Sequence, residues 1–491
     1  MHEYAVIIIS SGRLTKKEKK VLYDYTAEGG SVVTEAICAQ SVFNIDLKYS
    51  YLKFLYTGAD NIFNNSLVCD LYKGSKVSRK ANHLENQNNE NSILDFSIGK
   101  GNVIVFPEGF VSFIHQSGAI RKNFYSPFSS EYTSEQVSRV SKGVIRIHVQ
   151  KALEYLFHKR NLPFVHLRFF PNDAKNIFSF RVDTDLGTKE EIISLNDLLQ
   201  NFNITATWFV ETKSSQEWIR LFSELKNQEI AYHCYRHRIF LSYEKNVKDI
   251  KTGLKVLDNA GIKPKGYAAP YGSWTKTIAR VVDKFNFIYS SEFGFAYDAL
   301  PFYPFYNSVF SKALQIPIHP VSAGRLHWSG HSEENMINYF LNVIERKLIF
   351  DEPVILYTHP FEKRLNVFEK VFERIISFNS GSTQSISQKI PILTFSEYAE
   401  WWKKRLDINW DAEDRAGKVF ILTSNEDKSV KCRVIYPSGD KTILSLSNNE
   451  EKKVEEEKIE FNPSYNPNEL RKKTLKMIKY DILGKLRKLK Q

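Results

Sequence analysis

The pattern of apolar and polar positions near the start of the chain predicts a small parallel α/β domain. Residues 4–10, 31–34 and 102–106 are strand-like runs, and residues 15–27 form an amphipathic stretch typical of a helix. A helix between two strands returns the chain to the end of the sheet where the first strand began, so that the strands pair in parallel. We therefore predict an α/β domain over residues 1–130 and a connector over residues 131–170.

The middle of the chain alternates apolar runs with longer amphipathic stretches. Three strand-like runs contain or precede residues that carry chemistry: residues 177–185, 230–232 and 353–357. If these strands pair in parallel, their carboxyl ends face the same side of the sheet, where the active sites of parallel barrels gather. We therefore expect the polar residues at these strand ends to lie close together.

Past Trp410 the pattern changes to short β-like runs separated by turns, which predicts a small β module over residues 411–447. Residues 448–491 are predicted to form a charged linker and a basic tail. Between Leu470 and Gln491 there are nine Lys or Arg residues and one Asp. Five apolar residues of the tail recur at three- and four-residue spacing: Leu475, Ile478, Ile482, Leu486 and Leu489. This spacing predicts a basic amphipathic helix.

The composition narrows the class of protein. Hydrophobic residues make up 42% of the 491 positions, which is ample for folded cores. Four widely spaced cysteines lack a pairing pattern, which favours a reducing compartment. The first apolar run is too short for a signal sequence, and no stretch approaches the roughly 20 apolar residues of a membrane span. We therefore expect a cytoplasmic protein. The net charge of +12 is concentrated in the tail without interleaved aromatic residues, which disfavours nucleic acid as a partner.

Two carboxylates and three histidines of the middle region can form a mononuclear metal site. Asp183 and Asp185 stand at i and i+2 on a strand-like run, so that both side chains leave the same face. His233 and His237 have i, i+4 spacing, which places both imidazoles on one surface if a helix begins there. His359 follows the third run. A divalent metal takes two or three such ligands and leaves a position open for water.

Other candidate residues receive simpler interpretations. His327 and His331 repeat the i, i+4 spacing, but Gly330 lies between them and no strand carboxylate is near in sequence. We interpret them as polar loop residues that could face a substrate. Cys38 lacks the glycines of a nucleophile elbow, and we interpret it as a buried cysteine.

The order of the motifs resembles the polysaccharide deacetylase family, over roughly residues 171–405. The matching segments are, in order, Val-Asp-Thr-Asp (182–185), Ala-Thr-Trp-Phe-Val (206–210), His-Cys-Tyr-Arg-His (233–237), Tyr-Ala-Ala-Pro-Tyr-Gly (267–272), Leu-Tyr-Thr-His-Pro (356–360) and Ile-Leu-Thr-Phe-Ser-Glu-Tyr-Ala-Glu-Trp-Trp (392–402). The resemblance implies a distorted β/α barrel that acts on N-acetyl or O-acetyl groups of sugars. The N-terminal domain faintly resembles class I glutamine amidotransferase-like or flavodoxin-like domains, and we expect it to be structural or substrate-positioning.

The resemblance also implies a role for each motif residue. Asp183 corresponds to the catalytic base, and His359 to the general acid. Three residues correspond to the ligands of a divalent metal, for which zinc is the first expectation: Asp185, His233 and His237. In the family, the third motif forms one wall of the substrate groove and supplies the backbone N–H that donates to the developing oxyanion. The residues of this chain that correspond to it are Pro270, Tyr271 and Gly272.

The chain departs from the family pattern in two places. Ala268 stands where the family carries an Arg that pairs with the catalytic base. Arg181 lies two residues before Asp183 on the same strand face and could take over that pairing. The family's Asp and Trp that orient the base are not evident in Ser-Ser-Glu-Phe-Gly (290–294), where Glu292 is the single carboxylate.

These observations leave different classes of function open. The complete ligand and acid–base set favours a metal-dependent deacetylase, a hydrolase acting on carbon–nitrogen bonds other than peptide bonds, with an N-acetylated sugar of surface polysaccharide or glycolipid biosynthesis as substrate. Loss of the motif Arg at Ala268 would instead fit a non-catalytic saccharide-binding or membrane-associated scaffold. A related amidohydrolase acting on a small non-sugar amide would share the same site.

The tail has two interpretations of its own. Its apolar stripe could dock on another domain or chain and leave the charges in water. Alternatively, Leu470 to Gln491 could attach peripherally to an anionic leaflet, which would suit a lipid-carried substrate and place the protein on the inner face of the membrane.

Overall fold

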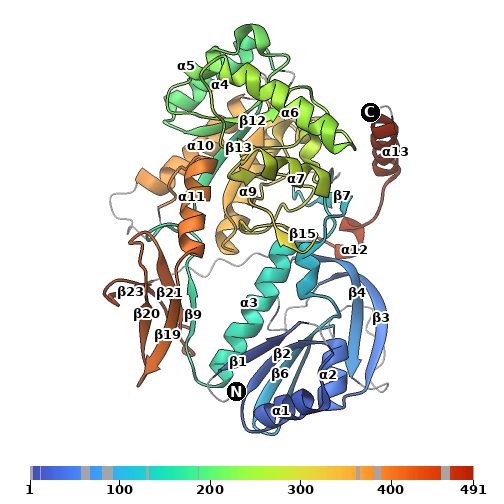
Figure 1. Cartoon of the computed structure of the whole chain (residues 1–491), viewed down its shortest axis with the longest axis vertical. Coiled ribbons are helices and arrows are strands. Elements are labelled where there is room, and N and C mark those ends of the chain that lie inside the picture. Colours follow the sequence, from blue (N-terminus) through green and yellow to red (C-terminus); the bar gives the residue numbers. More distant parts are fainter. Residues whose placement is uncertain are drawn as a thin grey trace. The chain divides into compact units, whose positions relative to one another are not determined.

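The computed structural model describes residues 4–10, 13–56, 63, 67–79, 92–128, 132–185, 187–360, 365–380, 389–454 and 465–489. These residues divide into two compact units (Figure 1). The first unit comprises residues 1–116, 140–168 and 408–462, and the second comprises residues 117–139, 169–407 and 463–491. Part of the predicted linker, residues 455–464, lies outside the described residues. Among the described helices, none has the length and apolar character needed to cross a bilayer.

The first unit contains a four-stranded sheet in the order β1-β2-β6-β5. Its strands are β1 (Val6–Ile9), β2 (Ser31–Glu35), β5 (Leu94–Ile98) and β6 (Gly101–Phe106). The first three strands in that order pair in parallel, as predicted, and β5 pairs antiparallel with β6. The unit's helices are α1 (Lys16–Ala27), α2 (Ala36–Phe43), η1 (Val111–His115) and α3 (Lys142–Lys159). Cys38 of α2 is buried in the core beside this sheet, as predicted.

Two further groups of strands belong to the first unit. A long hairpin is formed by β3 (Leu47–Leu55) and β4 (Cys69–Arg79). The region predicted as a β module over residues 411–447 contains β19 (Trp410–Arg415), β20 (Lys418–Thr423), β21 (Lys431–Ile435) and β22 (Lys441–Ser445). Strands β19 and β20 form a two-stranded sheet, and a four-stranded antiparallel sheet joins β21 and β22 to β9 (Phe164–Leu167) and β23 (Glu451–Lys453). The start of the predicted linker therefore supplies a strand. The segment 131–170, expected to be a connector, therefore supplies a sheet strand and the helix α3, whose buried apolar residues pack against the first sheet.

The second unit is built around seven parallel strands in the order β17-β14-β13-β12-β11-β10-β18. They are β10 (Phe178–Asp183), β11 (Ala206–Glu211), β12 (Glu229–Cys234), β13 (Gly266–Tyr267), β14 (Tyr289–Ser290), β17 (Leu314–Gln315) and β18 (Val354–Thr358). Shortly after β17, the His319 N–H donates to the Ile355 carbonyl of β18 at 2.9 Å. The sheet therefore curls until its two ends meet, and the predicted distorted β/α barrel is confirmed.

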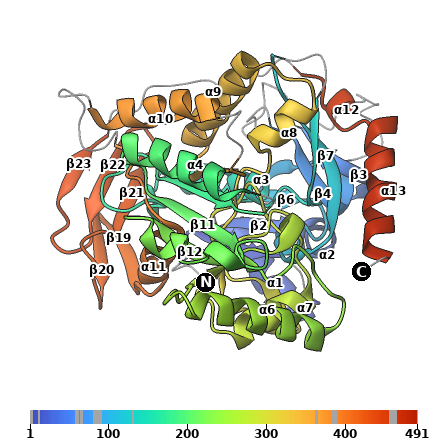
Figure 2. The same cartoon turned by 90° about the horizontal axis from the view of Figure 1, so that it is seen from above.

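Helices surround this curled sheet on its outer side (Figure 2). They are α4 (Lys189–Asn201), η2 (Gln216–Trp218), α5 (Leu221–Glu224), α6 (Tyr243–Asp258), α7 (Lys276–Lys284), α8 (Ala323–Trp328), α9 (Glu333–Ile349) and α10 (Leu365–Ser380). Two helices lie elsewhere: η3 (Pro270–Gly272) belongs to the loop after β13, and α11 (Phe395–Leu406) begins against the inward-facing residues Thr207 and Phe209 of β11. The remaining elements are the hairpins β7 (Ala119–Phe124)–β8 (Thr133–Ser138) and β15 (Phe305–Tyr306)–β16 (Val309–Phe310), and the tail helices α12 (Pro467–Leu470) and α13 (Leu475–Leu489).

Strand β10 shows how the barrel positions polar side chains. Its apolar residues alternate with polar ones, so that the two kinds leave opposite faces of the strand. Phe178 and Phe180 pack edge-to-face on the aromatic side chains of α10, outside the sheet. The alternate positions, Arg181 and Asp183, therefore point into the barrel, where both charged side chains are buried. The interior of the barrel thus contains charged groups that must find partners there.

Candidate metal centre

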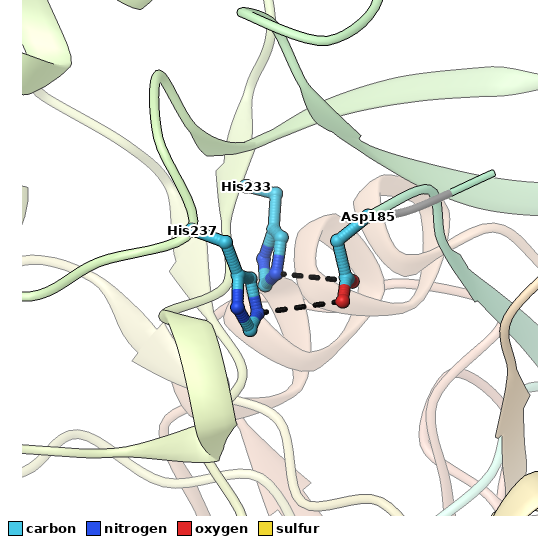
Figure 3. Close-up of side chains that lie close together, drawn as sticks. All are labelled: Asp185, His233 and His237. Atoms are coloured by element: carbon cyan, nitrogen blue, oxygen red, sulfur yellow. Dashed lines mark ion pairs between the residues drawn. The ribbon is translucent and has the colours of Figure 1, made fainter. Parts of the chain in front are cut away.

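Three predicted ligands meet at the carboxyl ends of the barrel strands (Figure 3). His233 Nε2 lies 3.5 Å from Asp185 Oδ1, and His237 Nε2 lies 3.5 Å from Asp185 Oδ2. His359 Nε2 lies 3.7 Å from the same Oδ1 atom. A second group of potential ligand atoms, all within 4.8 Å of one another, joins Asp183 and Asp185 to His359. The structure therefore brings together all five residues to which sequence reasoning gave a metal or acid–base role.

Strand register explains why residues so distant in sequence converge. In the parallel pairing of β10 with β18, Val182 lies opposite Thr358, so that Asp183 and His359 follow at neighbouring strand ends. Directly after β10, the Thr184 N–H donates to Phe209 O at 3.1 Å, and Thr184 Oγ1 accepts from the Glu211 N–H at 3.0 Å. These bonds to β11 fix the turn that carries Asp185.

No helix begins at His233, so the helical geometry considered for His233 and His237 does not apply. Strand β12 runs to Cys234, and α6 begins only at Tyr243. In the pairing with β11, the register shifts so that one residue, His233, is extra in the ladder. Such a β-bulge re-aims a side chain. His237 reaches the same carboxylate from the bends that follow the strand.

The contacts of His233 and Asp185 suit a metal ion. His233 Nδ1 lies 2.7 Å from Ala268 O, and because a carbonyl only accepts, that nitrogen carries the hydrogen. The lone pair on Nε2 then faces Asp185, an orientation typical of metal-bound imidazole. Neither His233 Nε2 nor Asp185 Oδ1 has a hydrogen-bond partner among the described residues, although both atoms are buried. Burial lowers the pKa of His233 to about 4, which keeps the ring neutral and able to bind metal.

Arg181 occupies the place next to Asp183 that sequence reasoning proposed for it. Its Nε and Nη2 donate to the two carboxylate oxygens of Asp183 at 2.6 and 2.8 Å. Its Nη1 donates to Ser291 O at 2.7 Å, and its guanidinium lies 4.6 Å from the centre of the Phe209 ring. Burial by itself would raise the pKa of Asp183, but the Arg181 guanidinium, together with His233 and His359, outweighs burial and holds that pKa below its ordinary value.

The loop of the third motif is held from behind by Glu292. The Ala269 N–H donates to Glu292 Oε1 at 3.1 Å, and the Ser290 hydroxyl donates to Glu292 Oε2. Within this loop, Tyr271 has a left-handed backbone conformation with φ of 60°. Its ring packs edge-on against His237, at 4.5 Å between ring centroids. Burial raises the pKa of Glu292 to about 7.

Sequence reasoning missed two residues that support the site, and it placed the second histidine pair in the wrong surroundings. Ser291 bonds Arg181, and Asp249 of α6 accepts from the Tyr235 N–H at 3.4 Å in the segment that carries His237. Neither has a sequence signal, because each depends on how distant elements pack. His327 belongs to α8, so it is not a loop residue. His331 lies in the loop between α8 and α9, as predicted, but it is buried against the Ser126 hydroxyl at 3.2 Å and therefore does not face a substrate.

The family model of the polysaccharide deacetylases matches residues 184–290. This match confirms the resemblance predicted from the motifs, over that segment of the chain. The segment is thus similar to polysaccharide deacetylases, the class of hydrolase that the motifs predict. No curated protein matches the chain.

Several solved structures are similar to part of the chain. A protein described as a polysaccharide deacetylase from Mycobacterium smegmatis is 18% identical, with 48% of this chain and 92% of that chain covered and a TM-score of 0.39. A family 4 carbohydrate esterase from Streptomyces lividans, solved with acetate, is 14% identical over 41% of this chain and 88% of that chain, with a TM-score of 0.30. A family 4 pseudoenzyme from Bacillus anthracis is 15% identical over 46% and 65% of the two chains, with a TM-score of 0.32. Scores this low support no statement about activity.

The buried pair of Arg181 and Asp183 predicts a large cost for losing the cation. Arg181→Met leaves the Asp183 carboxylate buried without its partner, which typically costs about 3–5 kcal/mol of the free energy of unfolding. Arg374→Met is the matched control, because Arg374 is partly exposed and covers Phe378. Urea denaturation at neutral pH measures both variants. Equal destabilisation of the two would contradict the proposed importance of the buried pair.

The raised pKa of Glu292 predicts a pH dependence of stability. Because the folded state holds this proton more tightly than the unfolded state, the stabilisation is complete below the ordinary value of 4.5 and is lost as the pH rises through about 7. The loss amounts to at most about 1.4 kcal/mol per pH unit. Glu292→Gln should flatten the unfolding free energy over this range, whereas Glu400→Gln, at an exposed ion pair, should leave its slope as in the wild type. Parallel slopes in wild type and Glu292→Gln would show that this carboxyl does not titrate as described.

Proposed function

Given that residues 184–290 match the polysaccharide deacetylase family, we propose that this chain is a metal-dependent deacetylase that removes an acetyl group from an N-acetylated sugar. The observation that carries the proposal is the meeting of Asp185, His233 and His237 around two buried atoms that have no hydrogen-bond partner among the described residues. Asp183 and His359 lie beside them, so that a ligand set and an acid–base pair occur together. A site that only binds a saccharide needs neither a set of metal ligands nor an acid–base pair beside it.

The donor set fits a divalent metal held by Asp185, His233 and His237. One carboxylate and two neutral imidazoles are typical of zinc in hydrolases, and we propose zinc as the resident ion. When bound, the ion would supply Lewis acidity, which polarises a carbonyl and makes water easier to deprotonate. His359 lies directly after β18 with its Nε2 3.7 Å from Asp185 Oδ1, and we assign it proton transfer to the leaving group.

The protein groups account for the proton movements of amide hydrolysis. Asp183, kept ionised by Arg181, accepts a proton from water as the water oxygen forms its bond to the acetyl carbon. The carbon–nitrogen bond then breaks, and His359 donates a proton to the nitrogen, which departs as the sugar amine while acetate forms. We assign the donation of a hydrogen bond to the developing oxyanion to the Tyr271 N–H, an interaction typically worth about 3–4 kcal/mol. The support is that Tyr271 has a left-handed backbone conformation in a loop held by the bonds of Gly272 with Ala269 and Gly294, next to Pro270.

Ala268 is the observation that favours the second candidate, a saccharide-binding scaffold without activity. If the family's Arg were replaced by Ala268 with no other change, the Asp183 carboxylate would have no cation beside it. Here Arg181 forms a bidentate pair with Asp183 from the same strand, so that the charge is restored from another position. Ala268 itself still orients His233 through its carbonyl. A small non-sugar amide as substrate would use the same groups and is distinguished by the substrate assay alone.

We further propose that the substrate belongs to surface polysaccharide or glycolipid biosynthesis and is met at the inner face of a membrane by a cytoplasmic protein. The support is the surface of the tail. Three apolar side chains of α13, Leu475, Ile478 and Ile482, are exposed in the second unit, and lysines flank them. A helix with an exposed apolar stripe bordered by lysines suits the interface of an anionic leaflet.

The division of roles between the two aspartates can be separated by mutation. Asp183→Asn should lower kcat on an N-acetylated chitooligosaccharide by at least about a hundredfold, because it removes the base, while bound metal stays near the wild-type level. Asp185→Asn should lose metal together with activity, because it removes a ligand. The measurements are acetate release and elemental analysis of each purified variant, with urea denaturation to confirm folding. Metal loss in Asp183→Asn alone would mean that the two roles are reversed, and equal metal loss in both variants would mean that Asp183 is a ligand as well, which contradicts its assignment as the base alone.

Vesicle binding tests the tail. Replacing Leu475, Ile478 and Ile482 by Ser should release the protein from vesicles of phosphatidylglycerol and phosphatidylcholine, and added salt should weaken wild-type binding, since each cation contributes about 1 kcal/mol at an anionic surface. Acetate release from a soluble chitooligosaccharide should remain unchanged. Val309→Ser with Phe310→Ser, at an exposed apolar pair elsewhere in the unit, is the control and should bind as the wild type does. Wild-type protein that fails to sediment with these vesicles would refute membrane contact.

A further inference from the structure

The C-terminal helix α13 turns two different faces to its surroundings. Met477 is 4% exposed and faces the protein, whereas Leu475, Ile478 and Ile482 are 86%, 43% and 53% exposed. The described part of the predicted apolar stripe, Leu475, Ile478 and Ile482, therefore lies on the outer face of the helix. A separate set of contacts holds the helix to the second unit, which also contains the barrel.

Asp481 is the one acidic residue between Leu470 and Gln491, among nine Lys or Arg residues. It faces the protein, and its Oδ1 accepts from Arg121 Nε of β7 at 3.0 Å. The Arg121 guanidinium also lies 5.4 Å from the centre of the Tyr480 ring. An acidic side chain on the outer face would be repelled by an anionic surface, and the inward position of Asp481 keeps its carboxylate off the outer face of the described part of the helix.

The contact of Arg121 with the tail continues into the β7–β8 hairpin. Glu135 of β8 lies 3.9 Å from Arg121 and accepts from Arg325 Nε of α8 at 2.6 Å. Arg325, Glu135, Arg121 and Asp481 thus form a line of alternating charges with little exposure at its centre. Alternating, partly buried charges hold their geometry better than isolated surface pairs do.

Neighbouring contacts fasten the start of the tail to the same hairpin. Arg471 Nη1 donates to Asn123 O at 3.0 Å, and Asn123 Nδ2 donates to Lys472 O at 3.3 Å. The rings of Tyr465 and Tyr125 lie 4.9 Å apart. Together with the Asp481 pair, these contacts attach the tail at several points along its length.

The hairpin is itself bonded to the wall of the candidate metal centre. The Ser138 N–H at the end of β8 donates to Phe293 O at 3.0 Å, next to Glu292. The Gly294 N–H donates to Gly272 O at 2.8 Å, in the loop that carries Tyr271. A continuous set of hydrogen bonds and ion pairs therefore runs from the tail helix through the hairpin to this loop.

We propose that Asp481 and Arg121 clasp the tail helix to the catalytic unit, so that an anionic membrane bound by the outer face of the helix holds the metal centre at a set orientation to the lipid surface. This inference rests on the proposed membrane contact and deepens it. A flexible anchor would merely raise the local concentration of enzyme, whereas a clasped helix also sets which side of the barrel faces the membrane. The lipid is recognised by its anionic headgroups and acyl region, not by a particular sugar.

Asp481→Asn separates the clasp from membrane binding, because it removes the ion pair and leaves the outer face intact. Glu373→Gln, at an exposed ion pair with Lys370, is the matched control for the change of charge. Hydrogen exchange of the peptide 475–489 without vesicles should speed up several-fold in Asp481→Asn alone. A donor dye on Lys251→Cys of α6 and an acceptor lipid then report the orientation on vesicles, since all four native cysteines are buried. The wild type and control should give a narrow distance distribution, and Asp481→Asn a broad one.

Three results would overturn the clasp. The first is unchanged hydrogen exchange in Asp481→Asn, and the second is the same narrow distance distribution in all variants. The third is loss of vesicle co-sedimentation in Asp481→Asn, because removing a negative charge cannot weaken the attraction of the outer face to phosphatidylglycerol. None of these readouts uses catalysis. Failure of the wild type to release acetate from a soluble chitooligosaccharide would therefore refute the proposed activity and leave the test of the clasp intact. If the protein is active, acetate release from a lipid-linked chitooligosaccharide in the vesicles should fall several-fold in Asp481→Asn while the soluble reaction is unchanged.

Discussion

Two buried polar atoms that face each other without a hydrogen bond are the constraint on which this structure depends. His233 Nε2 and Asp185 Oδ1 lie 3.5 Å apart at the ends of barrel strands, out of contact with solvent. Burying a nitrogen and an oxygen without hydrogen bonds costs free energy. A bound group that contacts both atoms, such as a metal ion, would offset that cost. The surrounding contacts serve that arrangement. The bulge in β12 aims the imidazole, Ala268 fixes its tautomer, and the bonds of Thr184 to β11 set the turn that carries the carboxylate.

The pair formed by Arg181 and Asp183 shows how a missing motif residue can be replaced without losing its physical role. The proposed reaction requires a cation that keeps the Asp183 carboxylate ionised in a buried setting, and the position in sequence from which the cation comes is secondary. An arginine two residues away on a strand reaches the carboxylate directly, with both oxygens bound. The substitution at Ala268 is therefore compatible with activity, and the choice between an enzyme and a binding scaffold depends on the metal rather than on that residue.

Much of the site could be predicted from sequence, because it follows from local periodicity. The i, i+2 spacing of Asp183 and Asp185 and the alternation along β10 are properties of one strand, and the parallel sheet places all strand ends at one edge. The bulge at His233 could not be predicted, since it depends on the register with β11. The same holds for the surroundings of His331, which come from packing against Ser126. In the tail, periodicity identified the apolar stripe, but which face docks on the protein was decided by Arg121, more than three hundred residues away in sequence.

Elemental analysis of the purified wild-type protein tests the central claim most directly. The measurement is the number of divalent ions per chain after extensive dialysis, compared with the Asp185→Asn variant prepared in the same way. The account predicts close to one ion per wild-type chain, with zinc foremost, and little or none in the variant, because the carboxylate and two imidazoles form the site together. A wild-type chain that takes up no ion even when zinc is supplied would contradict it, since the facing pair of Asp185 and His233 would then have some other cause.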